Sequence, residues 1–329
     1  MTYIESKSLD PYYNLALEQF VFDELAGENS FFMLWQNHNA IILGKHQNTL
    51  EEINAEFVKE HNITVARRLS GGGAVYHDLG NLNFTFIIPT DAKSGIDFSV
   101  FCKPIQKALC SFGVPVEILG RNDMYVEGKK FSGNAQYLKQ GKVMHHGTIL
   151  YDSDLGMLSK ALIAKDKIES KAVKSVRSTV TNIRPYMKLD MTTQEFWVAL
   201  KDSMIHAFNM DVFDLAPSHY SAVEELKEKV YAQWAWNYGN SPPYTMRKAR
   251  RFEGCGKIEI FLDMGKDGKI RGLSFFGDFF GSRDPQELGE LLAGHHLEYH
   301  ELKATLKGIE ASQYFHSLDT EAFLSLLFE

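Results

Sequence analysis

Apolar residues recur along the chain with two periods, and each period predicts one kind of element. Five segments carry apolar residues three or four positions apart, the spacing of a helix with one buried face. The first begins at Asp10, where an acidic N-cap precedes Pro11 at the first helical position, and it ends before Gly27. The predicted helices cover residues 10–26, 51–61, 97–112, 192–208 and 221–236.

Shorter apolar runs bounded by turn residues predict strands. Glycine-containing turns at residues 127–129, 139–142 and 265–268 join strands that follow one another directly, which is the pattern of antiparallel hairpins. A further strand is expected from Ala74 onward. The other predicted strands cover residues 31–35, 40–44, 63–66, 81–88, 116–119, 124–126, 143–150, 257–262 and 270–276.

The order of these elements predicts an α+β fold, because antiparallel neighbours occur with helices grouped apart from them. We expect mixed, mainly antiparallel sheets with flanking helices, and no doubly wound parallel sheet. The segment 237–243, rich in asparagine and proline, interrupts the helical pattern and marks the expected domain boundary. The prediction is a large domain at residues 1–240 and a small α+β domain at residues 245–329.

Composition and charge narrow the class of protein. The 329 residues are 44% hydrophobic, which is enough for a sizeable core. A formal net charge of −7 argues against non-specific binding to nucleic acid, which needs a broad basic face. Cys102, Cys110 and Cys255 form no Cys-x-x-Cys pair, which fits a reducing cytoplasm. The first residues do not resemble a signal peptide and no apolar run reaches membrane-spanning length, so we expect a soluble cytoplasmic protein with no nucleic-acid or membrane partner.

The most informative motif is Arg-Arg-Leu-Ser-Gly-Gly-Gly-Ala-Val-Tyr-His at residues 67–77. Consecutive glycines let backbone N–H groups converge on an anion, and the two arginines add charge and forked donors. A tight glycine turn between two strands is the structural alternative. The chain contains no Gly-x-x-x-x-Gly-Lys-Ser/Thr and no Gly-x-Gly-x-x-Gly opening a helix, so the motif is neither a P-loop nor a dinucleotide fingerprint.

A second polar cluster covers residues 121–134 and includes Lys130 near the start of a hairpin arm. Alternation along a strand places Lys129 and Lys130 on opposite faces, so one of them should face a ligand while the other faces solvent. Lys129 is the better candidate for the solvent side. Ser132 and Gly133 would let a ligand approach the backbone closely.

Paired histidines raise the question of a metal. The side chains of His145 and His146 should diverge in a strand, and no third ligand follows at a suitable spacing, so packing or hydrogen bonding at a ligand pocket is favoured over metal ligation. The pair at residues 295–296 is interpreted as a helix-terminal or surface pair. His77 with Asp78 could orient the glycine loop or stabilise a turn.

Taken together, these motifs resemble those of lipoate–protein ligases. The resemblance rests on segments at residues 67–83, 120–123, 129–133, 145–148 and 175–182, which occur in the family's order, and it covers nearly the full chain. It implies the biotin/lipoate ligase catalytic fold with a small accessory domain. The implied reaction forms lipoyl-AMP from lipoate and Mg-ATP. The lipoyl group would then be transferred to a lysine of an acceptor protein, which is a lipoyl domain of a 2-oxoacid dehydrogenase E2 subunit or the H protein.

The resemblance also assigns roles to residues. Lys130 would be the catalytic residue, acting by its charge, and Arg68, Lys130 and His146 would bind lipoate. Asp123 is a candidate Mg²⁺ ligand, with a structural role as the alternative. Residues 165–182 would close over the adenylate. The implied ATP and lipoyl-AMP positions are Arg68, Ser70, Gly73, Ala74, Val75, Tyr76, Asn122, Asp123 and Lys130.

Several alternatives remain open. A cysteine-dependent octanoyltransferase of the same fold would need a cysteine near the motif loops, and the three cysteines lie on a predicted helix or beyond the domain boundary. A biotin ligase and a non-catalytic lipoate- or nucleotide-binding regulator are the other possibilities. Two basic clusters are interpreted either as solvated faces or as docking sites for an acidic lipoyl domain. They are Lys165, Lys167, Lys171, Lys174 and Arg177, and Arg247, Lys248, Arg250 and Arg251.

Overall fold

A computed structural model describes residues 1–90, 97–120, 123–162, 180–238, 246–265 and 268–328. The expected domain boundary, the predicted ATP-site residue Asn122 and the basic cluster at residues 165–177 therefore lie wholly or mostly outside the described residues. So does most of the loop predicted to close over the adenylate. Within the described part of the chain, no helix has both the length and the apolar character needed to cross a membrane.

An eight-stranded mixed sheet forms the centre of the large domain, in the order β11-β1-β2-β6-β10-β9-β8-β7. The strand β1 pairs in parallel with both of its neighbours, and every other adjacent pair is antiparallel. The predicted α+β class is confirmed. The strands are β1 (Thr2–Glu5), β2 (Phe31–Trp35), β6 (Asn81–Pro89), β7 (Val116–Leu119), β8 (Asp123–Val126), β9 (Lys129–Lys139), β10 (Lys142–Leu150) and β11 (Asp211–Val212).

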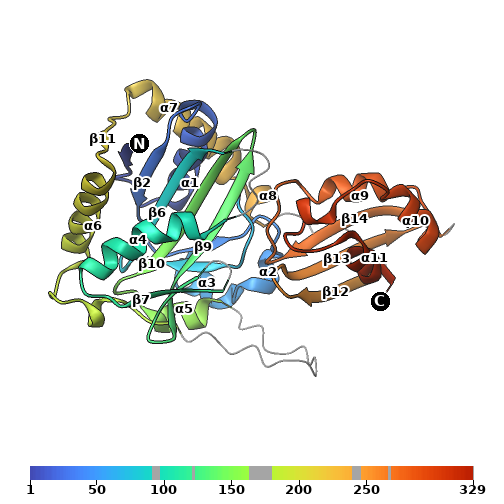
Figure 1. Cartoon of the computed structure of the whole chain (residues 1–329). Helices are drawn as coiled ribbons and strands as arrows, with labels where there is room; N and C mark the ends of the chain where they lie inside the picture. Colours follow the sequence, from blue (N-terminus) through green and yellow to red (C-terminus); the bar gives the residue numbers. More distant parts are fainter. Residues whose placement is uncertain (91–96, 121–122, 163–179, 239–245, 266–267, 329) are drawn as a thin grey trace.

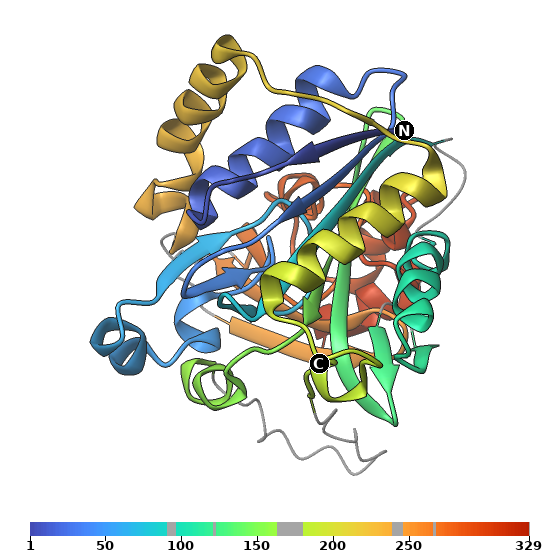
Figure 2. The same cartoon turned by 90° about the vertical axis from the view of Figure 1, so that its left-hand side faces the viewer.

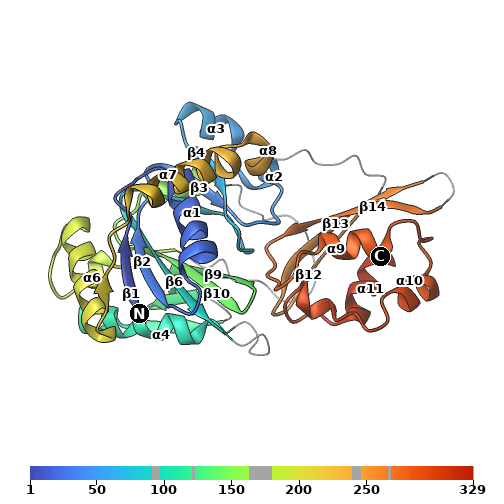
Figure 3. The ribbon, with the colours of Figure 1, turned by 90° about the horizontal axis from the view of Figure 1, so that it is seen from above.

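Helices cover both faces of this sheet (Figure 3). One face packs on α4 (Ser99–Ser111) and α6 (Thr193–Phe208) through an apolar core, and α6 lies in front of the strands in Figure 2. The other face packs on α1 (Pro11–Phe20) and α7 (Pro217–Leu226). Asp10 caps α1 by accepting a bond from the Tyr12 amide at 2.9 Å, as its sequence predicts.

Two predicted helices are divided in the structure. The segment predicted as residues 221–236 is α7, a wider turn at Lys227–Tyr231 and a separate short helix, α8 (Trp234–Asn237). The segment predicted as residues 51–61 is α2 (Thr49–Glu52) and α3 (Ala55–Glu60). The Asn54 side chain caps α3 by accepting from the Phe57 amide, and this new cap separates the two helices.

A second, three-stranded sheet carries the glycine motif. Its central strand β3 (Ala40–Leu43) pairs in parallel with β4 (Thr64–Arg67) and antiparallel with β5 (Val75–His77). The glycine run connects β4 to β5, so the motif does join two strands of one sheet. One further helix, α5 (Leu155–Ala161), packs near β5.

The small domain, drawn in orange and red in Figure 1, has its own apolar core. Three antiparallel strands, β12 (Met246–Phe252), β13 (Gly256–Met264) and β14 (Ile270–Gly277), pack on helices from the end of the chain. The strand β12 was not predicted, because four basic residues hide its alternation. The helices are α9 (Gln286–Leu292), α10 (Tyr299–Thr305) and α11 (Thr320–Phe328).

Candidate active site

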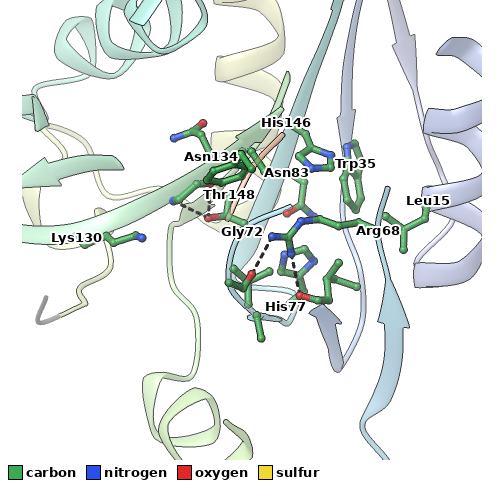
Figure 4. Close-up of a pocket in the computed structure, with 18 residues that line it drawn as sticks. Leu15, Trp35, Arg68, Gly72, His77, Asn83, Lys130, Asn134, His146 and Thr148 are labelled. Carbon is green, nitrogen blue, oxygen red and sulfur yellow. Dashed lines mark hydrogen bonds between the residues drawn. The ribbon is translucent and has the colours of Figure 1, made fainter. Parts of the chain in front are cut away.

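A cavity of about 120 Å³ lies where the glycine run faces β9 and β10. Figure 4 shows Lys130 at one end of the view and Leu15 with Trp35 at the other. Apolar side chains from α1, β2 and β3 line one part of the cavity together with Arg68, His77 and Asn83, while Asn134 and Thr148 lie toward Lys130. The cavity thus brings together most of the residues predicted from sequence: Arg68, Gly73, Ala74, Val75, Lys130 and His146.

A second cavity of about 150 Å³ adjoins the first. Tyr76, which does not line the first cavity, lines this one together with apolar residues of α5 such as Leu158. Five residues line both cavities, and Lys130 is the only charged one among them. The two cavities therefore share a wall at the Lys130 side chain.

The two adjacent lysines have different surroundings, as strand alternation predicts. Lys129 is exposed, whereas the Lys130 side chain is partly buried and lies over the backbone of Gly133. The Lys130 ammonium lies 2.8 Å from the Oδ1 atom of Asp123. Asp123 lines neither cavity, but it fixes the side chain that lines both.

Arg68 is buried beside the glycine run and organises it. Its Nη2 atom donates to the carbonyl oxygens of Gly71 and Gly73 at 2.7 and 2.8 Å. Its Nε atom donates to Ser70 Oγ, and Nη1 donates to the Ile42 carbonyl oxygen. These bonds use four of the five guanidinium N–H groups. Burial lowers the pKa of Arg68 to about 10, so it remains charged at neutral pH.

Arg67 does not share this role, contrary to the expectation that both guanidinium groups face an anion. It lines neither cavity. Its donors instead bond the carbonyl oxygens of Gly44, Lys45 and Gln47, and also reach the segment around Asn237. Arg67 therefore ties two chain segments to β4, and the strand register explains why adjacent arginines serve different purposes.

A hydrogen-bonded chain runs behind the cavity from Arg68 to Trp35. His146 Nε2 lies 2.7 Å from Ser70 Oγ, and His146 Nδ1 lies 3.0 Å from Glu18 Oε1. The same Glu18 oxygen accepts from the Thr85 hydroxyl, which accepts from the indole N–H of Trp35. Ser70 thus lies at the site without lining it.

Glu18 was missed by the sequence analysis. It is only 1% exposed and lies on α1, on the face that packs against the sheet. A carboxylate three positions after Leu15, among apolar residues of a predicted amphipathic helix, was the available signal. A buried carboxylate needs partners, and here His146 and Thr85 supply them.

Comparison with known proteins agrees with this geometry. Residues 10–205 match the Lipoyl protein ligase A/B catalytic domain, and residues 241–327 match the Bacterial lipoate protein ligase C-terminus. The chain belongs to the lipoate–protein ligase family. A lipoate-protein ligase of Bacillus subtilis is 41% identical over the whole of both chains, and lipoate–protein ligase 1 of Staphylococcus aureus is 38% identical over 99% of this chain and all of its own.

Solved structures of ligases share the fold. LipL1 of P. falciparum, determined in complex with lipoate, has a TM-score of 0.78 at 25% identity and covers 98% of this chain and 97% of its own. A lipoate-protein ligase A bound with ATP has a TM-score of 0.59 at 25% identity over 72% of this chain and 97% of its own. The predicted ligase fold is confirmed.

The small domain of the ligase touches the glycine run directly. The Gly72 amide donates to the Phe279 carbonyl oxygen at 3.2 Å, and Phe280 lines the first cavity. A Cβ atom on Gly71 would lie 2.2 Å from the Phe279 carbonyl oxygen. The glycines therefore make room for the small domain as well as for a ligand, which the sequence alone did not reveal.

None of the three cysteines lines either cavity of the ligase. Cys102 is buried on α4, where burial raises the pKa of its thiol to about 12. Cys110 is exposed on the same helix, and Cys255 is buried in the small domain. A cysteine thioester of the kind an octanoyltransferase forms has no side chain in the site to carry it.

The other histidines and the second basic cluster that the sequence singled out contact residues near them in the fold. His77 is buried with Asn37, and the Asp78 carboxylate accepts from the amides of Gly80 and Asp154, a turn-stabilising arrangement. The histidines at 295–296 both contact Glu301 at the surface. In the second basic cluster, Arg247 contacts Glu259 and Arg251 contacts Asp278, both within the small domain. No group of three or more metal-ligating side chains occurs in the described part of the chain.

Proposed function

We propose that the two cavities hold the two halves of one lipoyl-AMP intermediate, the acyl chain in the first and the adenylate in the second. The observation that carries this proposal is the position of Lys130, which lines both. The mixed anhydride that joins the two halves would then lie at the Lys130 ammonium. The apolar side chains of Leu15, Trp35 and Ile42 in the first cavity suit the hydrocarbon chain and dithiolane ring of lipoate.

The chemistry at this junction follows from charge. A carboxylate oxygen of lipoate attacks the α-phosphorus of ATP, and pyrophosphate leaves. An acceptor lysine amine then attacks the acyl carbon, and AMP leaves with the bonding electron pair. Lys130 stabilises the negative charge that develops on the phosphoryl oxygens in the first step and on the departing AMP in the second. Arg68 adds a second fixed charge to the lining of the first cavity.

Mg²⁺ is proposed to enter with the ATP phosphates. The ion prefers a carboxylate together with phosphate oxygens and water over a cage built only from protein. Asp123 fits as one such ligand, because its Oδ1 atom lies beside the Lys130 ammonium, while the contact of its Oδ2 atom with the Tyr125 hydroxyl is long, at 3.4 Å. When bound, the ion would neutralise charge on the phosphates.

The proposed acceptors are lipoyl domains of 2-oxoacid dehydrogenase E2 subunits and the H protein. A solved structure of a bi-partite lipoate protein ligase and its E2 lipoyl domain from Thermoplasma acidophilum supports the lipoyl domain as the acceptor class; it has a TM-score of 0.63 at 26% identity and covers 74% of this chain and 98% of its own. We also propose that the reaction takes place in the cytoplasm. This fits three cysteines with no disulfide among them.

The test is a transfer assay read by intact-protein mass spectrometry. The ligase is incubated with ATP, Mg²⁺, lipoate and a purified apo lipoyl domain, and the acceptor should gain the mass of one lipoyl group only when ATP is present. ATP-independent acyl transfer from an octanoyl carrier protein through a stable acyl-cysteine would contradict the proposal and favour the octanoyltransferase.

A further inference from the structure

Two residues that line the first cavity each carry a buried polar atom that has no hydrogen-bond partner in the described part of the chain. They are the Nε2 atom of His77 and the Nδ2 atom of Asn83. The two residues are only 2% and 1% exposed. A buried donor without a partner is costly, because it has lost its hydrogen bond to water and gained none in return. Two such donors in one cavity therefore indicate a ligand that pairs with them.

The tautomer of His77 follows from its neighbours. Asn14 Nδ2 donates to Asn37 Oδ1 at 2.8 Å, which fixes the orientation of the Asn37 amide. Asn37 Nδ2 therefore donates to His77 Nδ1 at 3.1 Å. Because Nδ1 accepts, the proton is on Nε2, the atom that has no partner. Burial also lowers the pKa of His77 to about 3, so the ring is neutral and Nε2 is a donor.

Asn83 presents its amide N–H group in the same way. Its Oδ1 atom accepts from Asn81 Nδ2 at 2.9 Å, which leaves Nδ2 without a partner. The residue lies on β6 between Trp35 of β2 and Thr148 of β10 in the sheet register. Figure 4 shows Asn83 and His77 near Arg68 and Trp35, with Lys130 apart at the end of the view.

The chemistry of the ligand decides which atom meets these donors, and this step rests on the proposed function. Lipoate has only two kinds of acceptor, its carboxylate and its ring sulfurs. Adenylation requires the carboxylate at Lys130, and the alkyl chain has no acceptor. We propose that His77 Nε2 and Asn83 Nδ2 donate hydrogen bonds to the dithiolane sulfurs, and so select lipoate over a plain fatty acid of similar length.

The test compares lipoate with octanoate, which lacks the sulfurs. His77→Asn keeps an oxygen that can accept from Asn37 but has no donor at the Nε2 position, because its amide N–H groups lie where the imidazole Cδ2 was. Asn83→Leu removes the second donor. Lipoate-dependent and octanoate-dependent ATP–pyrophosphate exchange are measured for each variant. The lipoate-to-octanoate ratio of kcat/KM should fall about tenfold in each variant, because only lipoate loses a bond.

A matched control is Asn134→Leu. Asn134 is also an amide that lines the cavity, but its side chain already bonds His145 and Ser132. This change should lower kcat/KM for lipoate and for octanoate by the same factor and so leave their ratio unchanged. If His77→Asn and Asn83→Leu also leave the ratio unchanged, the donors serve only a water or the packing, and the inference is wrong.

Failure of the proposed function would be visible separately. In that case the unmodified chain would show no lipoate-dependent exchange at all. Should either variant be too slow for kinetics, calorimetric binding of lipoate and octanoate gives the same ratio. An unchanged binding ratio in a folded variant would contradict the inference in the same way.

Discussion

The Lys130 ammonium lies 2.8 Å from the Asp123 carboxylate, on the wall that the two cavities share. Both side chains are partly exposed, at 28% and 20%, so incoming phosphates can reach the lysine. The carboxylate holds the ammonium in place before substrates arrive. It also partly neutralises the charge, so under the proposed function anionic substrates would compete with Asp123 for Lys130.

We therefore expect Asp123→Asn to slow adenylation by about tenfold, which corresponds to about 1.4 kcal/mol in the barrier. The variant loses the charge that orients Lys130 and a candidate Mg²⁺ ligand. The measurement is lipoate-dependent ATP–pyrophosphate exchange as a function of Mg²⁺ concentration. Glu117→Gln, an exposed change on the neighbouring strand β7, should have no effect. An unchanged rate for Asp123→Asn would show that this carboxylate has no part in the reaction.

Glu18 is expected to act through His146 on lipoate binding. Glu18→Gln removes the buried charge that accepts from both His146 and Thr85, and should raise KM for lipoate about tenfold while KM for ATP changes little. Steady-state exchange with each substrate varied in turn separates the two constants. Equal increases in both would instead indicate a general loss of structure, which a thermal melt would reveal.

Two adjacent glycines should respond differently to a methyl group. Gly72 has a φ of +90°, and a Cβ atom there would lie 2.8 Å from the Phe280 ring and 3.0 Å from Arg68. Gly72→Ala should therefore lower the free energy of unfolding by about 1–3 kcal/mol. Gly73 has no atom within 4 Å of its Cβ position, so Gly73→Ala should cost less than about 1 kcal/mol. Denaturant titration measures the free energy of unfolding of both variants. Equal losses in Gly72→Ala and Gly73→Ala would refute this prediction.

Three neutral histidines in the interior, of which His77 and His145 are buried and His46 is half-buried, should make the ligase acid-sensitive. Burial lowers the pKa of His46 and of His77 to about 3, and lowers that of His145 well below its usual value. Below about pH 6.5 the unfolded chain binds these three protons and the folded chain does not. The contribution of these histidines to the free energy of unfolding is therefore complete above this pH. It falls as the pH decreases toward 3, by about 4 kcal/mol per pH unit for three protons.

The measurement is the thermal midpoint at several pH values between about 7 and 5. His46→Phe should keep the stacking on Phe279, whose ring centroid lies 4.7 Å away, and remove one of the three protons. The slope should then fall by about one third. A midpoint that does not change over this range in the unmodified protein would contradict the assignment of neutral histidines.

Sequence alone predicted the parts of the site that depend on local pattern. Strand alternation correctly distinguished Lys130 from Lys129, and the glycine run correctly marked a connection between two strands. What it could not predict depends on contacts between distant segments. Glu18 meets His146 across 128 positions of the chain, and Gly72 meets Phe279 of the other domain. Neither contact leaves a periodic signal.

The incorrect predictions of secondary structure also have physical causes. The edge strand β12 carries two adjacent pairs of cations in place of an alternating apolar face, so its pattern resembles a charged loop. The predicted helix at residues 221–236 keeps its apolar period, but the chain widens into another turn at Lys227–Tyr231. The Tyr231 side chain is buried there and bonds Gln19 of α1, and this tertiary contact overrides the local preference.

The central claim is that Lys130 catalyses adenylation by its charge, and one exchange assay tests it most directly. Lys130→Ala and Lys129→Ala remove neighbouring lysines of the same strand, one lining both cavities and one exposed. Lipoate-dependent ATP–pyrophosphate exchange should fall at least about a hundredfold in Lys130→Ala, in line with the loss of one fixed charge at a transition state, and should be unaffected in Lys129→Ala. Exchange at the unmodified rate in a folded Lys130→Ala protein would contradict the account.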